Sequence, residues 1–217
     1  RKKTVEPYSA MDFIIESAEK YRNEKITICA LGPLTNLAKV LTKNPGVTES
    51  IEEIVLMGGG FFEGGNITPA AEFNIYVDPE AAKIVLNSGV KITMLPLDAT
   101  HKTLVQRNFL EKLRKSGKNS AREAAKLLDF FERYDVEKYG SQGGPLHDPN
   151  VIVYLLDPAI YKGKLVNVEI EVKSELTRGM TVVDWWNVTS RKPNAYYIND
   201  VKDDKFFEVV LNKVLNL

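Results

Sequence analysis

The sequence lacks several features that would each point to a class of protein. It has a single cysteine, Cys29, so no intrachain disulfide can form, and the apolar run 26–31 around it predicts a buried free thiol. No apolar run approaches the roughly 20 residues of a membrane span. The first residues are not the apolar stretch of a secretion signal. These absences favour a cytoplasmic location and predict no membrane partner.

Neither sign of charge is in excess, since 29 basic residues stand against 29 acidic ones. Proteins that bind nucleic acids or membrane surfaces usually carry a basic excess, so the sequence predicts neither partner. Histidine is scarce, with only His101 and His147. Hydrophobic residues make up 44% of the 217 positions, which is enough for a real core in one domain.

Helix-like and strand-like segments alternate along the first hundred residues. This βαβ pattern predicts an α/β fold: an open, mostly parallel, doubly wound sheet with helices on both faces. The expected helices cover 11–22, 33–43 (with Pro33 in the first turn) and 79–88 (capped by Asp78), and the expected strands cover 26–31, 52–57 and 91–97.

The second half reads differently, because helical patterns dominate it. We expect helices at 103–115, 119–139 and 202–216, a helix from Asp148, and a small antiparallel element at 164–172 and 180–186. Neither an internal repeat nor a linker interrupts the pattern, so residues 1–217 are expected to form a single domain.

The segment 57–74 places polar side chains directly after a buried strand. Its glycines at 58–60 would let the backbone come close to a bound molecule. Asn66, Glu72 and Asn74 are side chains of the kind that fix sugar hydroxyls. In an extended segment Glu72 and Asn74, two residues apart, would point to the same side. Taken singly, each also fits an ordinary turn, surface or strand-edge role.

A second polar motif, His147-Asp148-Pro149, follows the turn-forming residues 143–145. Local pattern alone favours a structural interpretation, in which Asp148 caps a helix and Pro149 occupies its first position. In that interpretation His147 is a surface residue.

Four segments follow one another along the chain: LGPLTN at 31–36, MGGGFFEGGNITPAAEFNIYVDPEAA at 57–82, PLHDP at 145–149 and LTRGMTVVD at 176–184. Together, and in this order, they resemble the inosine-uridine-preferring nucleoside hydrolases. The family's N-terminal aspartate cluster, of the form DxDxxxDD, is absent from these 217 residues. The resemblance therefore implies the C-terminal two thirds of such an enzyme, a domain that lacks its N-terminal strands and helices and is completed by an N-terminal polypeptide.

The resemblance implies a reaction and a set of residues for it. The reaction is Ca²⁺-assisted hydrolysis of the N-glycosidic bond of ribonucleosides, giving ribose and free base for nucleoside salvage. Asp148 and the backbone carbonyl of Leu31 would ligate calcium, and His147 would act as the acid beside the leaving base. The family's water-activating aspartate would lie in the absent segment, and a homo-oligomer, dimer or tetramer, is expected. The implied substrate contacts are Met57, Asn66, Glu72, Phe73, Asn74 and Tyr139.

Other interpretations remain open. One is a catalytically inactive remnant that binds nucleosides or sugars, or that only assembles with a partner; the intact polar set counts against it. Another is an unrelated α/β sugar-binding protein, which the His-Asp-Pro motif counts against. The choice between purine and pyrimidine bases is left open.

Several residues that look functional receive structural roles instead. Asp98 follows a strand, yet we expect it to cap the next helix or to brace the site without catalysing, and we expect His101 to lie outside the first layer around the substrate. Trp185 and Trp186 are expected to pack, as are most of the aromatic residues at 130, 131, 134 and 139.

Overall fold

The computed structural model describes residues 7–139 and 143–216, without side-chain detail at 131–139. Its elements, in chain order, are α1 (Ala10–Lys20), β1 (Ile26–Ala30), α2 (Thr35–Lys43), η1 (Pro45–Ser50), β2 (Ile51–Met57), α3 (Phe73–Val77), α4 (Pro79–Leu86), β3 (Ile92–Leu95), α5 (Leu97–Thr100), α6 (Arg107–Lys115), α7 (Asn119–Tyr139), α8 (Pro149–Leu156), η2 (Pro158–Ile160), β4 (Tyr161–Val166), β5 (Val168–Ile170), β6 (Thr181–Val183), β7 (Ala195–Val201) and α9 (Asp203–Leu215).

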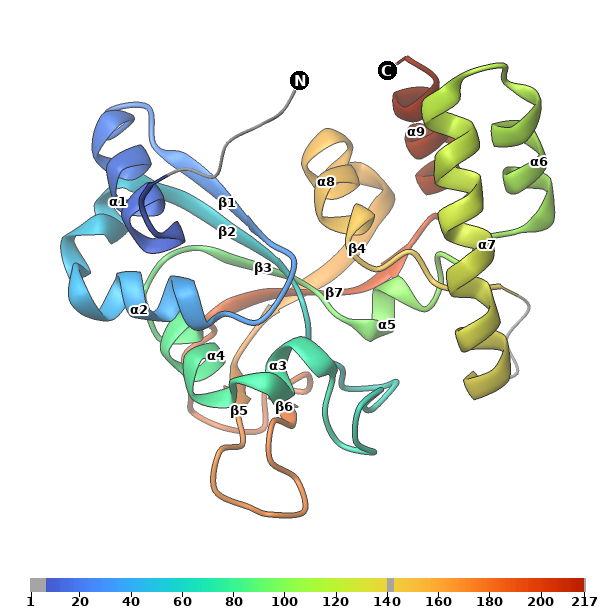
Figure 1. Ribbon diagram of the computed structural model, residues 1–217. Helices are drawn as coiled ribbons and strands as arrows, with labels where there is room; N and C mark the ends of the chain where they lie inside the picture. The colour runs from blue at the N-terminus through green and yellow to red at the C-terminus, as the bar shows by residue number, and fades with distance from the viewer. Residues whose placement is uncertain (1–6, 140–142, 217) are drawn as a thin grey trace.

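The central sheet has the strand order β1-β2-β3-β7-β4 (Figure 1). Strands β1, β2, β3 and β7 are parallel, and β4 pairs with β7 in the antiparallel sense. The mostly parallel α/β sheet expected from the sequence is therefore confirmed. The expected antiparallel strand at 164–172 is divided: β4 joins the main sheet, and β5 pairs with β6 in a separate two-stranded sheet.

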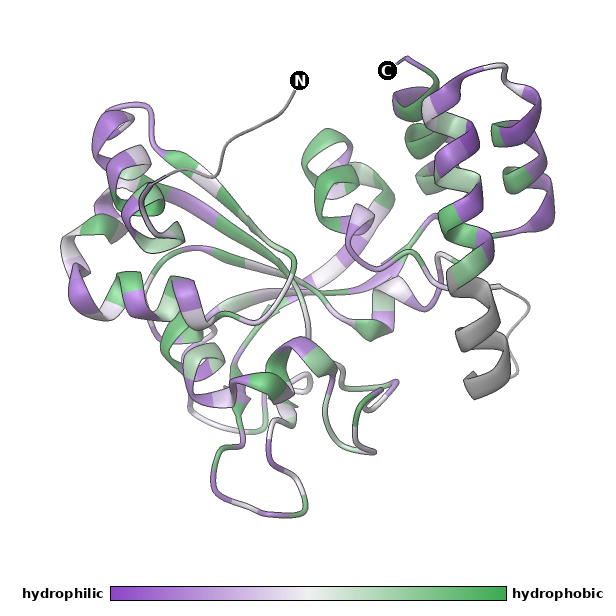
Figure 2. Cartoon of the chain, in the orientation of Figure 1, coloured by the Kyte–Doolittle hydropathy of each residue, from purple (hydrophilic) through white to green (hydrophobic). Residues whose placement is uncertain are grey.

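Alternate side chains of the parallel strands enter two different cores, as the period of a β-strand requires. Ile54 and Leu56 of β2 pack with α2 and α4 on one face, whereas Val55 lies in the core that α8 covers on the other face. Apolar residues are concentrated along the central strands and on α8 (Figure 2). A third core joins α6, α7 and α9, where the rings of Phe109 and Phe207 are 4.8 Å apart. Helices thus cover both faces of the sheet.

Several boundaries differ from the sequence-based expectation. Helix α2 begins at Thr35, so Pro33 precedes the helix instead of lying in its first turn. Strand β3 ends at Leu95, and the residues after it turn into the short helix α5. Asp78 does cap α4 as expected, since its carboxylate accepts a hydrogen bond from the backbone N–H of Ala81 at 3.0 Å.

The expected packing of the two tryptophans is confirmed for one of them. Trp185 packs, edge to face, against Phe62 and Tyr197. Trp186 is 75% exposed, so the expectation is wrong for that residue. Of the aromatic residues expected to pack on α7, Phe130 is 53% exposed, and the side chains at 131, 134 and 139 lie outside the described part of the structure.

One edge of the sheet is open within the described residues. Strand β1 pairs with β2 alone, so the N–H and C=O groups of its other edge have no strand beside them. Exposed apolar side chains occur near this end of the sheet, on Leu31 after β1 and on the outer side of α8, at Ile152, Leu155 and Leu156. Parallel sheets are usually covered on both faces and rarely expose such an edge.

Of the helices in the described residues, none combines the length and apolarity that crossing a membrane would require.

Candidate functional site

The side chain of Glu72 is fixed in the candidate site by three hydrogen bonds from backbone N–H groups. Glu72 precedes α3, and its carboxylate accepts hydrogen bonds from the backbone N–H groups of Asn74 at 2.9 Å, Gly59 at 3.0 Å and Ile75 at 3.3 Å. Capping by Glu72 starts a helix at Phe73, so the extended segment expected for 72–74 is wrong. Glu72 and Asn74 meet through one helical turn instead of through the alternation of a strand.

The electrostatics of Glu72 follow from its burial. With 2% of its surface exposed, the carboxyl loses hydration, which raises its pKa. The three N–H donors oppose that effect, and the charge of Asp148 adds to it. Asp148 and Glu72, 76 positions apart in the sequence, are therefore close enough for their charges to interact.

Asn74 and Met57 form a second fixed pair. The Asn74 amide donates to the Met57 carbonyl at 3.1 Å and contacts the Met57 sulfur at 3.3 Å. These bonds fix the plane of the amide and leave its oxygen for a ligand, since no described residue donates to that oxygen. Met57 itself is buried in the core under α8.

The glycines after β2 allow close packing of protein against protein. A Cβ on Gly60 would lie 2.1 Å from the carbonyl oxygen of Gly64, and one on Gly59 would lie 2.7 Å from Oγ1 of Thr181. Gly59 also has φ of +83°, which favours glycine. Packing within the protein is thus enough to require glycine at 59 and 60, and the approach of a ligand to this backbone stays a prediction.

Asn66 and Asp98 brace that loop. The amide oxygen of Asn66 accepts the N–H of Phe73 at 2.9 Å, so this oxygen already has a structural task. The buried Asp98 carboxylate accepts the N–H groups of Phe61 at 3.0 Å and Glu63 at 2.7 Å, and the hydroxyl of Tyr197 donates to it as well. The geometry agrees with the bracing role expected for Asp98. Phe73 leaves about half of its surface exposed beside Asn74.

His147 is held through one ring nitrogen. Its Nδ1 lies 2.8 Å from Oγ1 of Thr100, a fully buried residue at the end of α5. Its ring centre lies 5.7 Å from that of His101, whose Nδ1 contacts a carboxylate oxygen of Glu63 at 3.3 Å. Burial and the neighbouring His101 lower the pKa of His147 to about 4, so the ring is neutral near pH 7.

Asp148 occupies the capping position of α8 without capping it. Its backbone already has helical dihedral angles, and its side chain makes no capping hydrogen bond. The structural interpretation of Asp148 therefore fails, and its exposed carboxylate remains available. Partial burial raises the pKa of this carboxyl.

The two calcium ligands expected from the sequence, Asp148 and the Leu31 carbonyl, fit calcium in kind but not in number. Leu31 lies one residue beyond the last paired residue of β1 and is 41% exposed. Carboxylate and carbonyl oxygens are the ligands calcium prefers, usually about six to eight of them. The described residues contain no group of three or more His, Cys, Asp or Glu suited to a metal.

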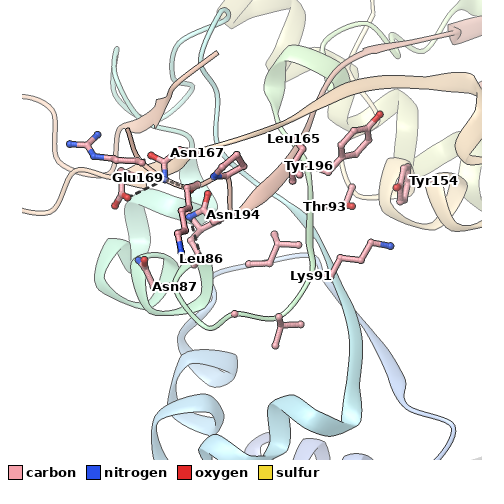
Figure 3. A pocket seen from close by; sticks show the side chains of 16 residues that line it. Leu86, Asn87, Lys91, Thr93, Tyr154, Leu165, Asn167, Glu169, Asn194 and Tyr196 are labelled. Atoms are coloured by element: carbon pink, nitrogen blue, oxygen red, sulfur yellow. Dashed lines mark hydrogen bonds between the residues drawn. The ribbon is translucent and has the colours of Figure 1, made fainter. Parts of the chain in front are cut away.

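Two further features lie apart from this arrangement. The side chain of Tyr139, an expected substrate contact, lies outside the described part of the structure. A groove of about 980 Å³ lies at the amino-terminal ends of β3 and β7, away from the carboxyl ends of the strands. It is lined by Lys91, Thr93, Asn167 and Tyr196, among others (Figure 3). It contains none of the expected site residues.

Sequence reasoning missed Thr100 and the polar residues behind it. Thr103, Asn150 and Tyr161 form buried hydrogen bonds: the Asn150 amide donates to the Thr103 hydroxyl at 2.9 Å, and the Tyr161 hydroxyl donates to the Asn150 amide oxygen at 3.0 Å. The signal available in the sequence was weak, because Thr100 and His147 are 47 positions apart and only folding brings them together.

Comparison with known proteins decides the family. The family model described as inosine-uridine preferring nucleoside hydrolase matches residues 1–208. The chain belongs to this nucleoside hydrolase family. The resemblance given by its four sequence segments is thereby confirmed.

Individual relatives agree with the family assignment. The chain is 47% identical over 205 residues to the Schizosaccharomyces pombe protein C1683.06c, covering 94% of this chain and 66% of that protein. It is 44% identical to the pyrimidine-specific ribonucleoside hydrolase RihA of Salmonella gallinarum, covering 88% of this chain and 61% of the relative. The structure of the purine-preferring ribonucleoside hydrolase from Gardnerella vaginalis superposes with a TM-score of 0.89 at 30% identity, covering 99% of this chain and 67% of the other. The nucleoside hydrolase chain thus spans 61–66% of the length of these curated relatives.

Proposed function

We propose that this nucleoside hydrolase chain carries the sugar-binding side and the leaving-group side of a site that hydrolyses the N-glycosidic bond of ribonucleosides. The observation that carries the proposal is the meeting of two separate segments, Glu72 with Asn74 and His147 with Asp148, around the end of the parallel strands. Ligands of such sheets bind beyond the carboxyl ends of the strands. The family assignment and the relatives' names support the reaction.

The proposed contacts to the ribose follow from the hydrogen bonds that Glu72 and Asn74 already make. One carboxylate oxygen of Glu72 accepts a single N–H, from Asn74, and so keeps a lone pair for a ribose hydroxyl. The Asn74 amide oxygen offers a second acceptor. As the glycosidic bond breaks, the sugar gains oxocarbenium character, and the negative charge of Glu72 stabilises it. Phe73 and Met57 supply apolar surface, Asn66 holds the loop, and Tyr139 is proposed as a further contact.

Asp148 and the Leu31 carbonyl are proposed to hold a calcium ion. When bound, the ion would lower the pKa of a water molecule and so supply the nucleophile. On the protein side, Asp148 is suited to this task because its carboxylate is exposed and makes no capping hydrogen bond to α8.

A further polypeptide segment is proposed to complete the site. The support is physical: the donors present fill only part of a calcium shell, and β1 has an open edge within the described residues. In this proposal a strand of that segment pairs with β1, and its aspartates supply the remaining ligands and activate water.

His147 is proposed to assist the leaving base. The ring is neutral near pH 7 because its pKa is lowered to about 4, so in the resting site it acts as a hydrogen-bond donor to the base. As negative charge develops on the departing base, this hydrogen bond strengthens and stabilises the charge while the proton stays on the ring.

Replacing His147 with alanine tests this assignment. Natural nucleosides, whose bases leave poorly, are expected to lose about 10²–10⁴-fold in kcat, the range that positioned acid–base groups supply. A nitrophenyl riboside carries its own good leaving group and is expected to lose about threefold at most. Steady-state kinetics on both substrates measures the contrast. Equal losses would show that His147 positions the sugar or the metal instead.

A second candidate is a chain that binds nucleosides without cleaving them, either alone or with a partner. The absence of a metal-binding acidic cluster from the described residues favours it. Binding of uridine without release of ribose, by the full-length protein with calcium, would establish it. Base preference, a cytoplasmic location, nucleoside salvage and a homo-oligomer stay predictions.

A further inference from the structure

Thr100 is the residue behind His147 that the proposed function leaves without a role. It lies at the end of α5, is fully buried, and places Oγ1 at 2.8 Å from Nδ1 of His147. The other ring nitrogen, Nε2, makes no hydrogen bond to any described residue. The ring is therefore fixed on one side and open on the other.

The backbone around both residues is fixed as well. The Leu146 N–H donates to the Thr103 carbonyl at 3.0 Å, and the Thr103 hydroxyl donates to the Thr100 carbonyl at 2.9 Å. The amide of Asn150, fully buried in the first turn of α8, also donates to the Leu146 carbonyl. These bonds join the segment that carries His147 to the end of α5, so the distance between Thr100 and His147 is set by the fold.

The direction of the Thr100–His147 hydrogen bond follows from counting partners. A threonine hydroxyl has one proton to donate. Within the described part of the chain, the Thr100 hydroxyl has Nδ1 of His147 as its sole partner. If Nδ1 carried a proton and donated it, the Thr100 proton would have no acceptor in a buried place, which is unfavourable. If Thr100 donates, both groups are satisfied and the imidazole proton lies on Nε2.

We propose that Thr100 is a positioning residue that fixes the tautomer of His147, with Nδ1 accepting from Thr100 and Nε2–H directed toward the leaving base. This inference rests on the proposed role of His147 in hydrolysis. The Thr100 hydrogen bond explains why Nε2, which makes no hydrogen bond to a described residue, carries the proton and can donate it in a hydrogen bond to the base. A ring free to exchange tautomers would present an acceptor to the base for part of the time.

The direct test is nitrogen NMR of the full-length protein labelled with ¹⁵N-histidine, at neutral pH. The His147 resonances are assigned by their loss in His147→Gln. The expected result is an unprotonated Nδ1 and a protonated Nε2 in the wild type. The same tautomer is expected in Thr100→Ser, which keeps the hydroxyl, and a mixture of tautomers in Thr100→Val. A protonated Nδ1 in the wild type overturns the proposal, whatever the activity of the protein.

Kinetics supplies a second readout. Thr100→Val is expected to lower kcat on uridine or inosine about tenfold, a part of the roughly 10²–10⁴-fold contribution of the acid–base group itself, and to change nitrophenyl riboside hydrolysis by about twofold at most. Thr100→Ser should restore most of the loss. Equal losses on both substrates, or no rescue by serine, would contradict the positioning role.

Thr93→Val is the matched control, because Thr93 is also a fully buried threonine with a bonded hydroxyl, to Glu53, but lies in β3 away from His147. It should change stability without altering the His147 tautomer or the ratio of the two substrates. A wild type that cleaves no nucleoside would remove the proposed function and leave the tautomer measurement to decide the role of Thr100.

Discussion

Replacing Asp148 with alanine is expected to abolish turnover of nucleosides in the full-length protein while leaving the fold largely intact. The Asp148 carboxylate makes no capping bond to α8 and is exposed, so its removal takes away no structural hydrogen bond. As a proposed direct calcium ligand it should matter more than outer-shell partners of metal ligands, whose loss typically costs about 10–100-fold in affinity or activity. Calorimetric titration with calcium and steady-state kinetics measure both effects.

Asp157→Ala is a suitable control for this variant. Asp157 ends the same helix, α8, and likewise makes no capping bond with its side chain. It should leave calcium affinity and turnover near the wild-type values. If Asp148→Ala bound calcium with unchanged affinity, Asp148 would not be a metal ligand. A large fall in melting temperature would instead support a structural role for Asp148.

Residues 1–217 expressed alone are expected to show no hydrolysis, even with saturating calcium. Two physical reasons support this. The described residues offer a partial ligand set, and the open edge of β1 leaves backbone groups without partners in a sheet type that is normally buried. Hydrogen exchange should be faster for the amides of β1 than for those of β2 and β3, which have a strand on each side.

The comparison for this second experiment is residues 1–217 together with the N-terminal segment that is proposed to complete the site. There the β1 amides should gain protection, and calcium-dependent hydrolysis should be present. Soluble, calcium-dependent hydrolysis by residues 1–217 alone would contradict the proposal that a further segment completes the site.

The fold was predictable where pattern and physics are local. Continuous apolar runs identified β1, β2 and β3, and Asp78 with Pro79 identified the start of α4. Strand β7 escaped prediction although it lies between β3 and β4 in the sheet. Its sequence, AYYINDV, includes Asn199 and Asp200, and a central parallel strand normally reads as an apolar run. Its pairing with β3 joins residues about a hundred positions apart, which no local pattern encodes.

The site was predictable in its residues and less so in its geometry. The family segments pointed to Glu72, Asn74, His147 and Asp148, and the structure brings these together. The shape of the 72–74 segment was missed, because a spacing of two suggests a strand whereas Glu72 caps α3 with its own side chain. The hydrogen bond from Thr100 could not be foreseen, since it depends on the meeting of α5 with the segment before α8.

Product analysis tests most directly whether the protein hydrolyses nucleosides to ribose and free base. The full-length protein is incubated with uridine and with inosine in the presence of calcium, and free ribose and free base are quantified by chromatography. We expect ribose and base to appear in equal amounts from at least one of the two nucleosides, and we expect a calcium chelator to stop their release. Nucleoside binding in equilibrium dialysis without any release of ribose would contradict it.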